Sequence, residues 1–234
     1  MKTHDYEKFA NAYAQLEIKD TFYLAYRDIP ELIKKHVKGK KALDFGCGGG
    51  RSTRFLKKLG LDTTGVDNSQ DMINEAQQKD FDGTYEIIED NKLTFDDSTF
   101  DFIFSSIVFM EISSKEEMTQ ILKEMNRVLK ENGIIIIITD AENMYEVDWA
   151  SFVYPDRSKL ESGQKVKVVI QGTGIELFDY YWEDKDYREA FANSKLNVVE
   201  THKPLAKGDE PFKWVSEIRF PHWMIYVLKK QVRP

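Results

Sequence analysis

Apolar residues at helical spacing mark the first forty positions of the chain. Through Tyr6–Gly39 they recur every three or four residues, as on one face of an α-helix. Pro30 must break or restart this pattern, because proline has no amide hydrogen to donate, and Gly39 suits the end of a helix. The pattern predicts a helical extension over residues 1–38.

From residue 41 onward, short apolar runs alternate with helical patterns. Strands are expected at 41–45, 62–67, 84–89 and 100–106, and helices at 51–60 and 69–79. Ser114 and Glu117 have the spacing of a capping box at the start of another helix. The run Ile134–Ile138 lacks any polar alternation, which is typical of a strand buried on both faces of a parallel sheet. Such alternation predicts a doubly wound α/β sheet.

The pattern changes after Asp140. An irregular, aromatic stretch is followed by strand-like runs at 165–171, 175–182, 196–202 and 223–230, with a helix at 184–194. We expect the last two strands to pair antiparallel at an edge of the sheet. We expect residues 141–180 to form a substrate-side insertion within a single domain, residues 1–234, rather than a second domain.

Composition and charge fit a globular domain and exclude some partners. The 234 residues are 41% hydrophobic and 31% charged, with a net charge of −7 spread along the chain. This charge argues against nucleic acid, whose phosphates require clustered Lys and Arg. The longest apolar run, Gly133–Thr139, is too short to span a bilayer, and the first residues hold no signal-peptide core. We therefore expect a soluble protein with no membrane partner.

A glycine-rich loop joins the first expected strand to the first expected helix of the sheet. Gly46, Gly48, Gly49 and Gly50 surround the single cysteine, Cys47. A helix N-terminus offers free N–H groups, and glycine lets a ligand lie against the backbone. We interpret Cys47 as a small loop residue rather than a nucleophile, because no His or Asn signature accompanies it. A lone cysteine also excludes an intrachain disulfide and favours a cytoplasmic location.

Two cofactors compete for such a loop. A dinucleotide requires G-x-G-x-x-G, but the sixth position here is Arg51, and the spacing is G-x-G-x-G with Asp44 two residues ahead. With the segments that follow, this resembles motif I of the class I S-adenosylmethionine-dependent methyltransferases, strongly over residues 40–140 and loosely elsewhere. The resemblance implies a Rossmann-like sheet of seven strands, mostly parallel with one antiparallel strand, beneath an N-terminal helical lid. It also implies S-adenosylmethionine as cofactor and S-adenosylhomocysteine as product.

The resemblance places several residues around the cofactor. Asp67, at the end of the second strand, would accept hydrogen bonds from the ribose hydroxyls, although Asn68 and Ser69 also suit a helix start. Met72 would cover the adenine, although core packing explains it almost as well. The other cofactor contacts implied here come from Gly46, Cys47, Gly48 and Asn68.

The segment after the third strand is similar to the family's acidic residue and D-x-S-F-D pattern. Glu89 or Asp90 would accept a hydrogen bond from the adenine amino group, and the spacing does not separate the two. Ser105, near the end of the fourth strand, would line the cofactor. In related small-molecule enzymes, an arginine of the N-terminal helices pairs with the cofactor carboxylate. Arg27 is the candidate, and a solvated helix arginine is the alternative.

The chemistry expected of such a site is methyl transfer by in-line displacement. The methyl donor is already activated, so positioning does most of the work. The four histidines are scattered without metal-ligand spacing, so we assign no metal and no catalytic base.

The acceptor is expected to be a small molecule methylated on N or O, because the proline-containing motifs of nucleic-acid and protein-glutamine methyltransferases are absent. Tyr13, Tyr180 and Trp182 are the candidates for substrate contact, and core packing is the alternative for each. A monomer or homodimer is expected. A non-catalytic S-adenosylmethionine-binding module and an NAD(P)-dependent oxidoreductase are the alternative functions.

Overall fold

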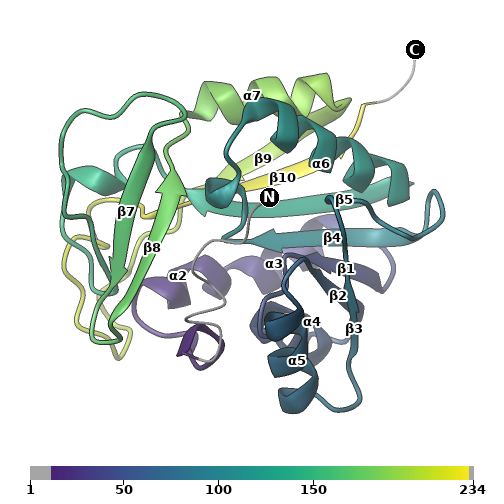
Figure 1. Ribbon diagram of the computed structural model, residues 1–234, viewed down its shortest axis with the longest axis horizontal. Helices are drawn as coiled ribbons and strands as arrows, with labels where there is room; N and C mark the ends of the chain where they lie inside the picture. The colour runs from purple at the N-terminus through teal and green to yellow at the C-terminus, as the bar shows by residue number, and fades with distance from the viewer. Residues whose placement is uncertain (1–11, 232–234) are drawn as a thin grey trace.

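The architecture is a seven-stranded sheet in the order β3-β2-β1-β4-β5-β10-β9 (Figure 1). The computed structural model describes residues 12–231, so residues 1–11 of the expected lid lie outside the described part. The strands are β1 (Lys41–Phe45), β2 (Asp62–Asp67), β3 (Thr84–Ile87), β4 (Phe100–Ser106), β5 (Leu129–Asp140), β9 (Leu196–His202) and β10 (Trp223–Lys230). β10 runs antiparallel to both of its neighbours, whereas the other pairs are parallel. The expected mostly parallel sheet with one antiparallel strand is confirmed.

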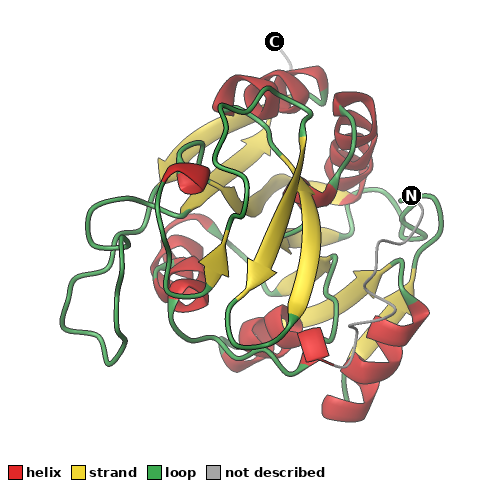
Figure 2. Cartoon of the chain, turned by 60° about the vertical axis from the view of Figure 1, so that its left-hand side comes forward, coloured by secondary structure: helices red, strands yellow, loops and turns green. Residues whose placement is uncertain are grey.

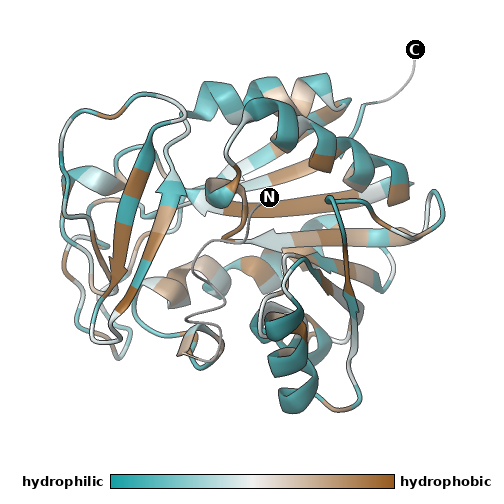
Figure 3. Cartoon of the chain, viewed as in Figure 1, coloured by the Kyte–Doolittle hydropathy of each residue, from teal (hydrophilic) through white to brown (hydrophobic). Residues whose placement is uncertain are grey.

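Helices cover both faces of this sheet. They are α2 (Thr21–Arg27), α3 (Ile29–His36), α4 (Arg51–Lys58), α5 (Gln70–Lys79), α6 (Lys115–Val128) and α7 (Asp184–Asn193), with short 3₁₀ turns η1 (Phe109–Glu111) and η2 (Met144–Glu146). Within β5, Ile134, Ile136 and Ile138 pack on the side of α2, α3 and α4, whereas Ile135 and Ile137 pack on the side of α6 and α7. Both faces of β5 are therefore buried, as its unbroken isoleucine run predicts, and Figure 3 shows this strand as strongly hydrophobic.

Some local features differ from the sequence-based expectations. The last two strands, β9 and β10, do pair antiparallel at one edge of the sheet as expected, with β9 outermost and β10 between β9 and β5. At the start of α6, the Ser114 hydroxyl accepts a hydrogen bond from the Glu117 amide at 3.2 Å. The Glu117 carboxylate, however, accepts from the Asn91 side-chain amide at 3.1 Å. The side chain of Glu117 is thus used to hold the loop after β3.

The segment after β5 forms a small antiparallel sheet of its own. It consists of β6 (Phe152–Val153), β7 (Lys165–Ile170) and β8 (Ile175–Tyr180), in the order β6-β7-β8. Figure 2 shows this sheet in front of the main one, and its buried side chains join the same hydrophobic core as α2 and α3. Buried residues alternate along β7 and β8 with exposed or half-buried ones, which is typical of a sheet with one buried face.

The helical extension breaks near the proline. Pro30 lies in the first turn of α3. Amides in a first turn make no hydrogen bond within the helix, so the proline costs none. Gly39 follows three residues after the end of α3 with φ +103°, and a Cβ atom there would lie 2.4 Å from the carboxyl carbon of Asp101. None of the helices within residues 12–231 is long and apolar enough to cross a membrane.

Candidate active site

The loop between β1 and α4 has a backbone that other residues do not readily adopt. Gly46 and Gly48 have φ values of +71° and +49°, in the left-handed region that favours glycine. A Cβ atom on Gly46 would lie 2.4 Å from a methyl carbon of Val108. A Cβ atom on Gly48 would meet only the Met72 sulfur, at 4.0 Å. The loop is thus packed on one side and open on the other.

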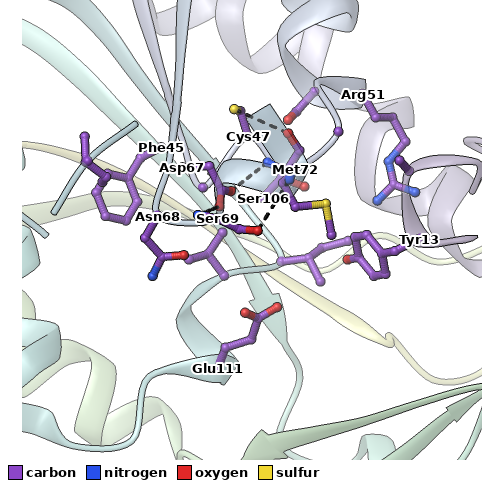
Figure 4. A pocket seen from close by; sticks show the side chains of 18 of the residues that line it. Tyr13, Phe45, Cys47, Arg51, Asp67, Asn68, Ser69, Met72, Ser106 and Glu111 are labelled. Atoms are coloured by element: carbon purple, nitrogen blue, oxygen red, sulfur yellow. Dashed lines mark hydrogen bonds between the residues drawn. The ribbon is translucent and has the colours of Figure 1, made fainter. Parts of the chain in front are cut away.

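A cavity of about 1040 Å³, measured out to its open mouth, lies on the open side of this loop. It forms where the carboxyl ends of β1, β2 and β4 meet, the position at which doubly wound sheets bind ligands. Figure 4 shows side chains from several elements gathered around it. The polar and loop residues that line it include Tyr13, Gly46, Cys47, Gly48, Arg51, Asp67, Asn68, Ser69, Asn91, Ser106 and Glu111, and the apolar ones include Met72, Ile88, Ile107 and Ile112.

Asp67 is held in a fixed orientation at this cavity. Its two carboxylate oxygens accept hydrogen bonds from the backbone amides of Gly48 at 2.8 Å and Ser69 at 2.9 Å. Burial raises the pKa of Asp67, and these amide hydrogen bonds oppose that change. Each carboxylate oxygen keeps acceptor capacity beyond its one amide, so the side chain can receive hydroxyl donors from a ligand. Ser69 also caps α5, which leaves Asn68 and Met72 beside Asp67 on the wall of the cavity.

Asp44, by contrast, supports the loop from behind. It is fully buried, and one oxygen accepts hydrogen bonds from the hydroxyls of Ser52 and Thr53, both at 2.6 Å. Burial raises the pKa of this carboxyl to about 6, although the two hydroxyls favour its charged form. The contact ties the end of β1 to the first turn of α4, which fixes the direction of the glycine loop.

Cys47 lies on the cavity wall as a buried thiol. Burial raises its pKa well above the ordinary value, and the nearby carboxylates Asp44 and Asp67 act in the same direction. The neutral thiol is therefore favoured over the thiolate, which fits the interpretation of Cys47 as a small loop residue.

The loop after β3 places different residues at the cavity from those expected. Glu89 and Asp90 are exposed and do not line the cavity, whereas Ile88 and Asn91 on either side of them do. Asp90 and Asn91 have φ values of +49° and +56°, so the chain reverses its direction at these two residues. A count along the sequence does not reveal this turn, and the adenine-binding roles of Glu89 and Asp90 stay predictions.

A similar shift by one position occurs at the end of β4. Ser105 is fully buried, and its hydroxyl has no hydrogen-bond partner among residues 12–231. Ser106 lines the cavity, and its hydroxyl lies 2.8 Å from that of Tyr26. Because alternate strand residues face opposite sides, only one of two adjacent serines meets the cavity.

Arg27 does not reach the cavity, and Arg51 does. The Arg27 guanidinium donates to Asp28 at 2.8 Å, to Glu210 at 2.9 Å and to the Leu205 carbonyl at 2.8 Å, so its donors are engaged elsewhere. Its expected role at the cofactor carboxylate finds no support in this placement.

Arg51, the first residue of α4, lines the cavity instead. Its guanidinium lies 4.9 Å from the ring centroid of Phe22 and 5.9 Å from those of Tyr13 and Tyr26. Within residues 12–231, no carboxylate lies at ion-pair distance from Arg51. The aromatic rings hold its cation in place, and a ligand carboxylate would supply the opposite charge. The sequence signal for this role was an arginine directly after the glycine loop.

The three candidate substrate contacts separate in the structure. Tyr13 lines the cavity, and burial raises the pKa of its phenol, so the hydroxyl stays protonated. Trp182 is buried among core residues and donates through its indole nitrogen to the Ile112 carbonyl at 3.0 Å. Tyr180 packs against that same core and does not line the cavity. Sequence reasoning also missed Glu111, which faces the cavity from η1 (Figure 4).

Comparisons with known proteins agree with this geometry. A family model described as a methyltransferase domain matches residues 43–137, which run from β1 into β5. The probable S-adenosyl-L-methionine-dependent methyltransferase TehB of Haemophilus influenzae is 32% identical over 177 residues, or 72% of this chain and 52% of that protein. The chain belongs to the class I S-adenosylmethionine-dependent methyltransferases. The resemblance in the sequence is thereby confirmed, and S-adenosylmethionine is the cofactor of this methyltransferase.

Two further similarities extend over most of the methyltransferase. The uncharacterized protein MJ1252 of Methanocaldococcus jannaschii is 26% identical over 204 residues, which are 84% of this chain and 76% of that protein. A crystal structure of an S-adenosylmethionine-dependent methyltransferase from Clostridium acetobutylicum matches with a TM-score of 0.66 and 16% identity, covering 97% of this chain and 99% of that one. At this identity the match concerns the fold. The chain spans about half the length of TehB.

Proposed function

We propose that this methyltransferase transfers a methyl group from S-adenosylmethionine to an N or O atom of a small molecule bound in the same cavity. The observation that carries the proposal is the Asp67 carboxylate, fixed by two backbone amides at the wall of the cavity beside the open glycine loop. A carboxylate in this position suits the two adjacent hydroxyls of a ribose, because it accepts hydrogen bonds through both oxygens.

The lining residues fit the other parts of the cofactor. Ile88, whose amide donates to the Asp67 carbonyl, provides apolar surface for a base next to Asp67. Met72 and the side-chain amide of Asn91 also line the cavity. Arg51 offers a guanidinium for the carboxylate of the methionine part. The cofactor supplies an activated methyl group on a sulfonium. The protein's contribution is to hold donor and acceptor in line and to exclude water.

We assign the acceptor to the side of the cavity formed by Tyr13 and Glu111. In Figure 4, Glu111 lies apart from Cys47 and Asp67, and Tyr13 lies beside Arg51, away from Asp67 and Asn68. Tyr13 belongs to the expected lid, and η1, which carries Glu111, packs against β8 of the 141–180 segment. We therefore propose that both segments enclose the acceptor.

The test is a pair of binding measurements. S-Adenosylhomocysteine should raise the melting temperature of the full chain, because a ligand that binds only the folded state stabilises it by mass action, whereas NAD should not. A melting temperature that stays flat in millimolar S-adenosylhomocysteine contradicts the cofactor site. Binding without any methyl transfer across an acceptor screen would favour the non-catalytic binding module.

A further inference from the structure

Three carboxylates stand on elements that meet next to the cavity, because η1 contacts both β5 and β8. They are Glu111 on η1, Asp140 at the carboxyl end of β5 and Asp179 on β8. Burial, together with the charges of Asp179 and Glu111, raises the pKa of Asp140 well above its usual range. Within residues 12–231, no Lys or Arg lies at ion-pair distance from Asp140 or Asp179. We call Glu111, Asp140 and Asp179 the acidic cluster.

The acidic cluster contains polar atoms that the protein leaves without partners. One carboxylate oxygen of Asp140 is buried and has no hydrogen-bond partner among residues 12–231. The same holds for Nδ1 of His222, whose side chain is only 1% exposed and which lies 4.0 Å from the other oxygen of Asp140. Burial lowers the pKa of His222 well below its usual value, so the imidazole is neutral and does not balance the acids. The unpaired acceptor of Asp140 and the free ring nitrogen of His222 are buried polar atoms that the protein leaves unsatisfied, and a hydrogen-bonding ligand would satisfy them.

Aromatic rings surround these atoms. The Tyr145 ring centroid lies 4.8 Å from that of Tyr154 and 5.5 Å from that of Tyr181, and the Tyr154 hydroxyl lies 3.0 Å from Nε2 of His222. Burial and the charges of Asp140 and Asp179 raise the pKa of both Tyr145 and Tyr154, so these phenols are neutral. Asp140 and Asp179, with aromatic faces nearby and no Lys or Arg of residues 12–231 at ion-pair distance, form a chemical environment that attracts an organic cation.

The acidic cluster adjoins the cavity of the cofactor. Glu111 belongs to both, and the charges of Glu111 and Asp179 reach Tyr13 on the cavity wall. The strand register gives the same placement, because Ser106 of the cavity wall pairs with Ile138, two residues before Asp140.

We propose that the acceptor of this methyltransferase is an amine, bound as its ammonium ion by Asp140 and Asp179. The inference rests on the proposed function, since it names the substrate class of that same site. Of the two atoms that the proposed function allows, nitrogen rather than oxygen is then the one that receives the methyl group.

The reaction balances with the groups present. An ammonium has no lone pair, so its nitrogen first passes one proton to a carboxylate of the acidic cluster, which becomes a carboxylic acid. The free amine then forms the N–C bond as the S–C bond of the sulfonium breaks, and the electron pair of that bond stays on sulfur. The product is a methylated ammonium ion beside a neutral thioether. The carboxylic acid returns its proton to solvent when the product leaves.

The test compares amines with their alcohol counterparts on the full chain saturated with S-adenosylhomocysteine. The probes are 2-phenylethylamine against 2-phenylethanol, tyramine against tyrosol, and 1,5-diaminopentane against 1,5-pentanediol, measured by calorimetry at pH 8. We expect at least one amine to bind tenfold or more tightly than its alcohol. That preference should fall about tenfold in Asp179→Asn and in Asp140→Asn, and it should persist in Glu176→Gln.

Glu176 is the matched control, because it lies on the same strand as Asp179 but is exposed and pairs with Lys167 at 2.9 Å. Alcohols that bind as well as every amine, or an amine preference unchanged in both Asp variants, would overturn the inference while leaving the cofactor site intact. Absence of S-adenosylhomocysteine binding would instead contradict the proposed function itself. Melting curves of the variants establish that each one is folded.

Discussion

The substitution Asp179→Asn should stabilise the protein at neutral pH, by an amount that depends on pH. Burial raises the pKa of Asp179 from 3.8 to about 7. The folded protein therefore keeps the Asp179 proton to higher pH than the unfolded chain does. Under this linkage, the contribution of Asp179 to the free energy of unfolding falls as pH rises from about 4 to about 7, and it is constant above that.

The magnitude follows from the two pKa values. Each pKa unit corresponds to about 1.4 kcal/mol, so the difference between 3.8 and about 7 gives a ceiling of roughly 4 kcal/mol at pH 8. Asn has nearly the same shape and carries no charge at any pH. The substitution also removes the charge of Asp179 that raises the pKa of Asp140.

Urea denaturation at pH 4, 6 and 8 measures the effect. The difference in unfolding free energy between Asp179→Asn and the parent protein should be smallest at pH 4, grow through pH 6 and reach its largest value at pH 8. Most other titrating groups are common to both proteins, and their contributions cancel. One example is Asp28, whose pKa lies below the usual value because Arg27 and His202 outweigh the effect of burial. Asp140 does not cancel, because the charge of Asp179 raises its pKa, and removal of that charge stabilises the variant in the same direction as the predicted trend. Glu176→Gln should show no such trend. A parent protein that is more stable than Asp179→Asn at pH 8, or a difference independent of pH, would refute the reasoning.

Three further substitutions test the cofactor half of the site. Asp67→Ala should weaken S-adenosylhomocysteine binding by about 1.5–3 kcal/mol, the range for lost charge-assisted hydrogen bonds. Calorimetry measures this loss. An affinity within twofold of the parent would show that Asp67 does not hold the ribose. Arg51→Met should lower the affinity for S-adenosylhomocysteine roughly tenfold or more and leave that for adenosine, which has no carboxylate, nearly unchanged. Equal losses for both ligands would instead indicate a collapsed cavity. Arg27→Met should leave S-adenosylhomocysteine affinity within about twofold but lower the urea midpoint, because Asp28 and Glu210 lose their shared cation. A large loss of cofactor affinity in this variant would show that Arg27 contributes to cofactor binding after all.

The sheet was predictable because its signals are local. The isoleucine run of β5 and the glycine loop after β1 each depend on a few adjacent residues whose burial or backbone conformation admits little else. Asp67 was predictable for the same reason, since it ends β2 and its position relative to the loop follows from the parallel pairing of β1 with β2.

Some side chains do not lie where the sequence placed them. In two cases the sequence offered neighbouring residues that face different ways, and it gave no signal to choose between them. Ser105 and Ser106 differ by one step along β4, and that step decides which hydroxyl meets the cavity. In the loop after β3, two successive residues with positive φ turn Glu89 outward and Asn91 inward. Arg27 is engaged by Glu210, which lies 183 positions later in the chain, and no local pattern reports such a contact.

The acidic cluster lies beyond local prediction for a further reason, and that reason bears on function. Arg27 with Asp28 and Glu210 shows how this fold treats charge that serves stability, because opposite charges meet. The pKa of Asp28 lies below its usual range because of Arg27 and His202, and that of Glu210 because backbone amides and the Trp214 indole donate to it. Asp140 and Asp179 show the opposite arrangement, since their pKa values are raised and no cation within residues 12–231 pairs with them. Buried acids of this kind destabilise a fold, and apolar residues of similar volume would stabilise it. A pair of acids that weakens the fold at the edge of an active site is therefore best explained by the ligand that they bind.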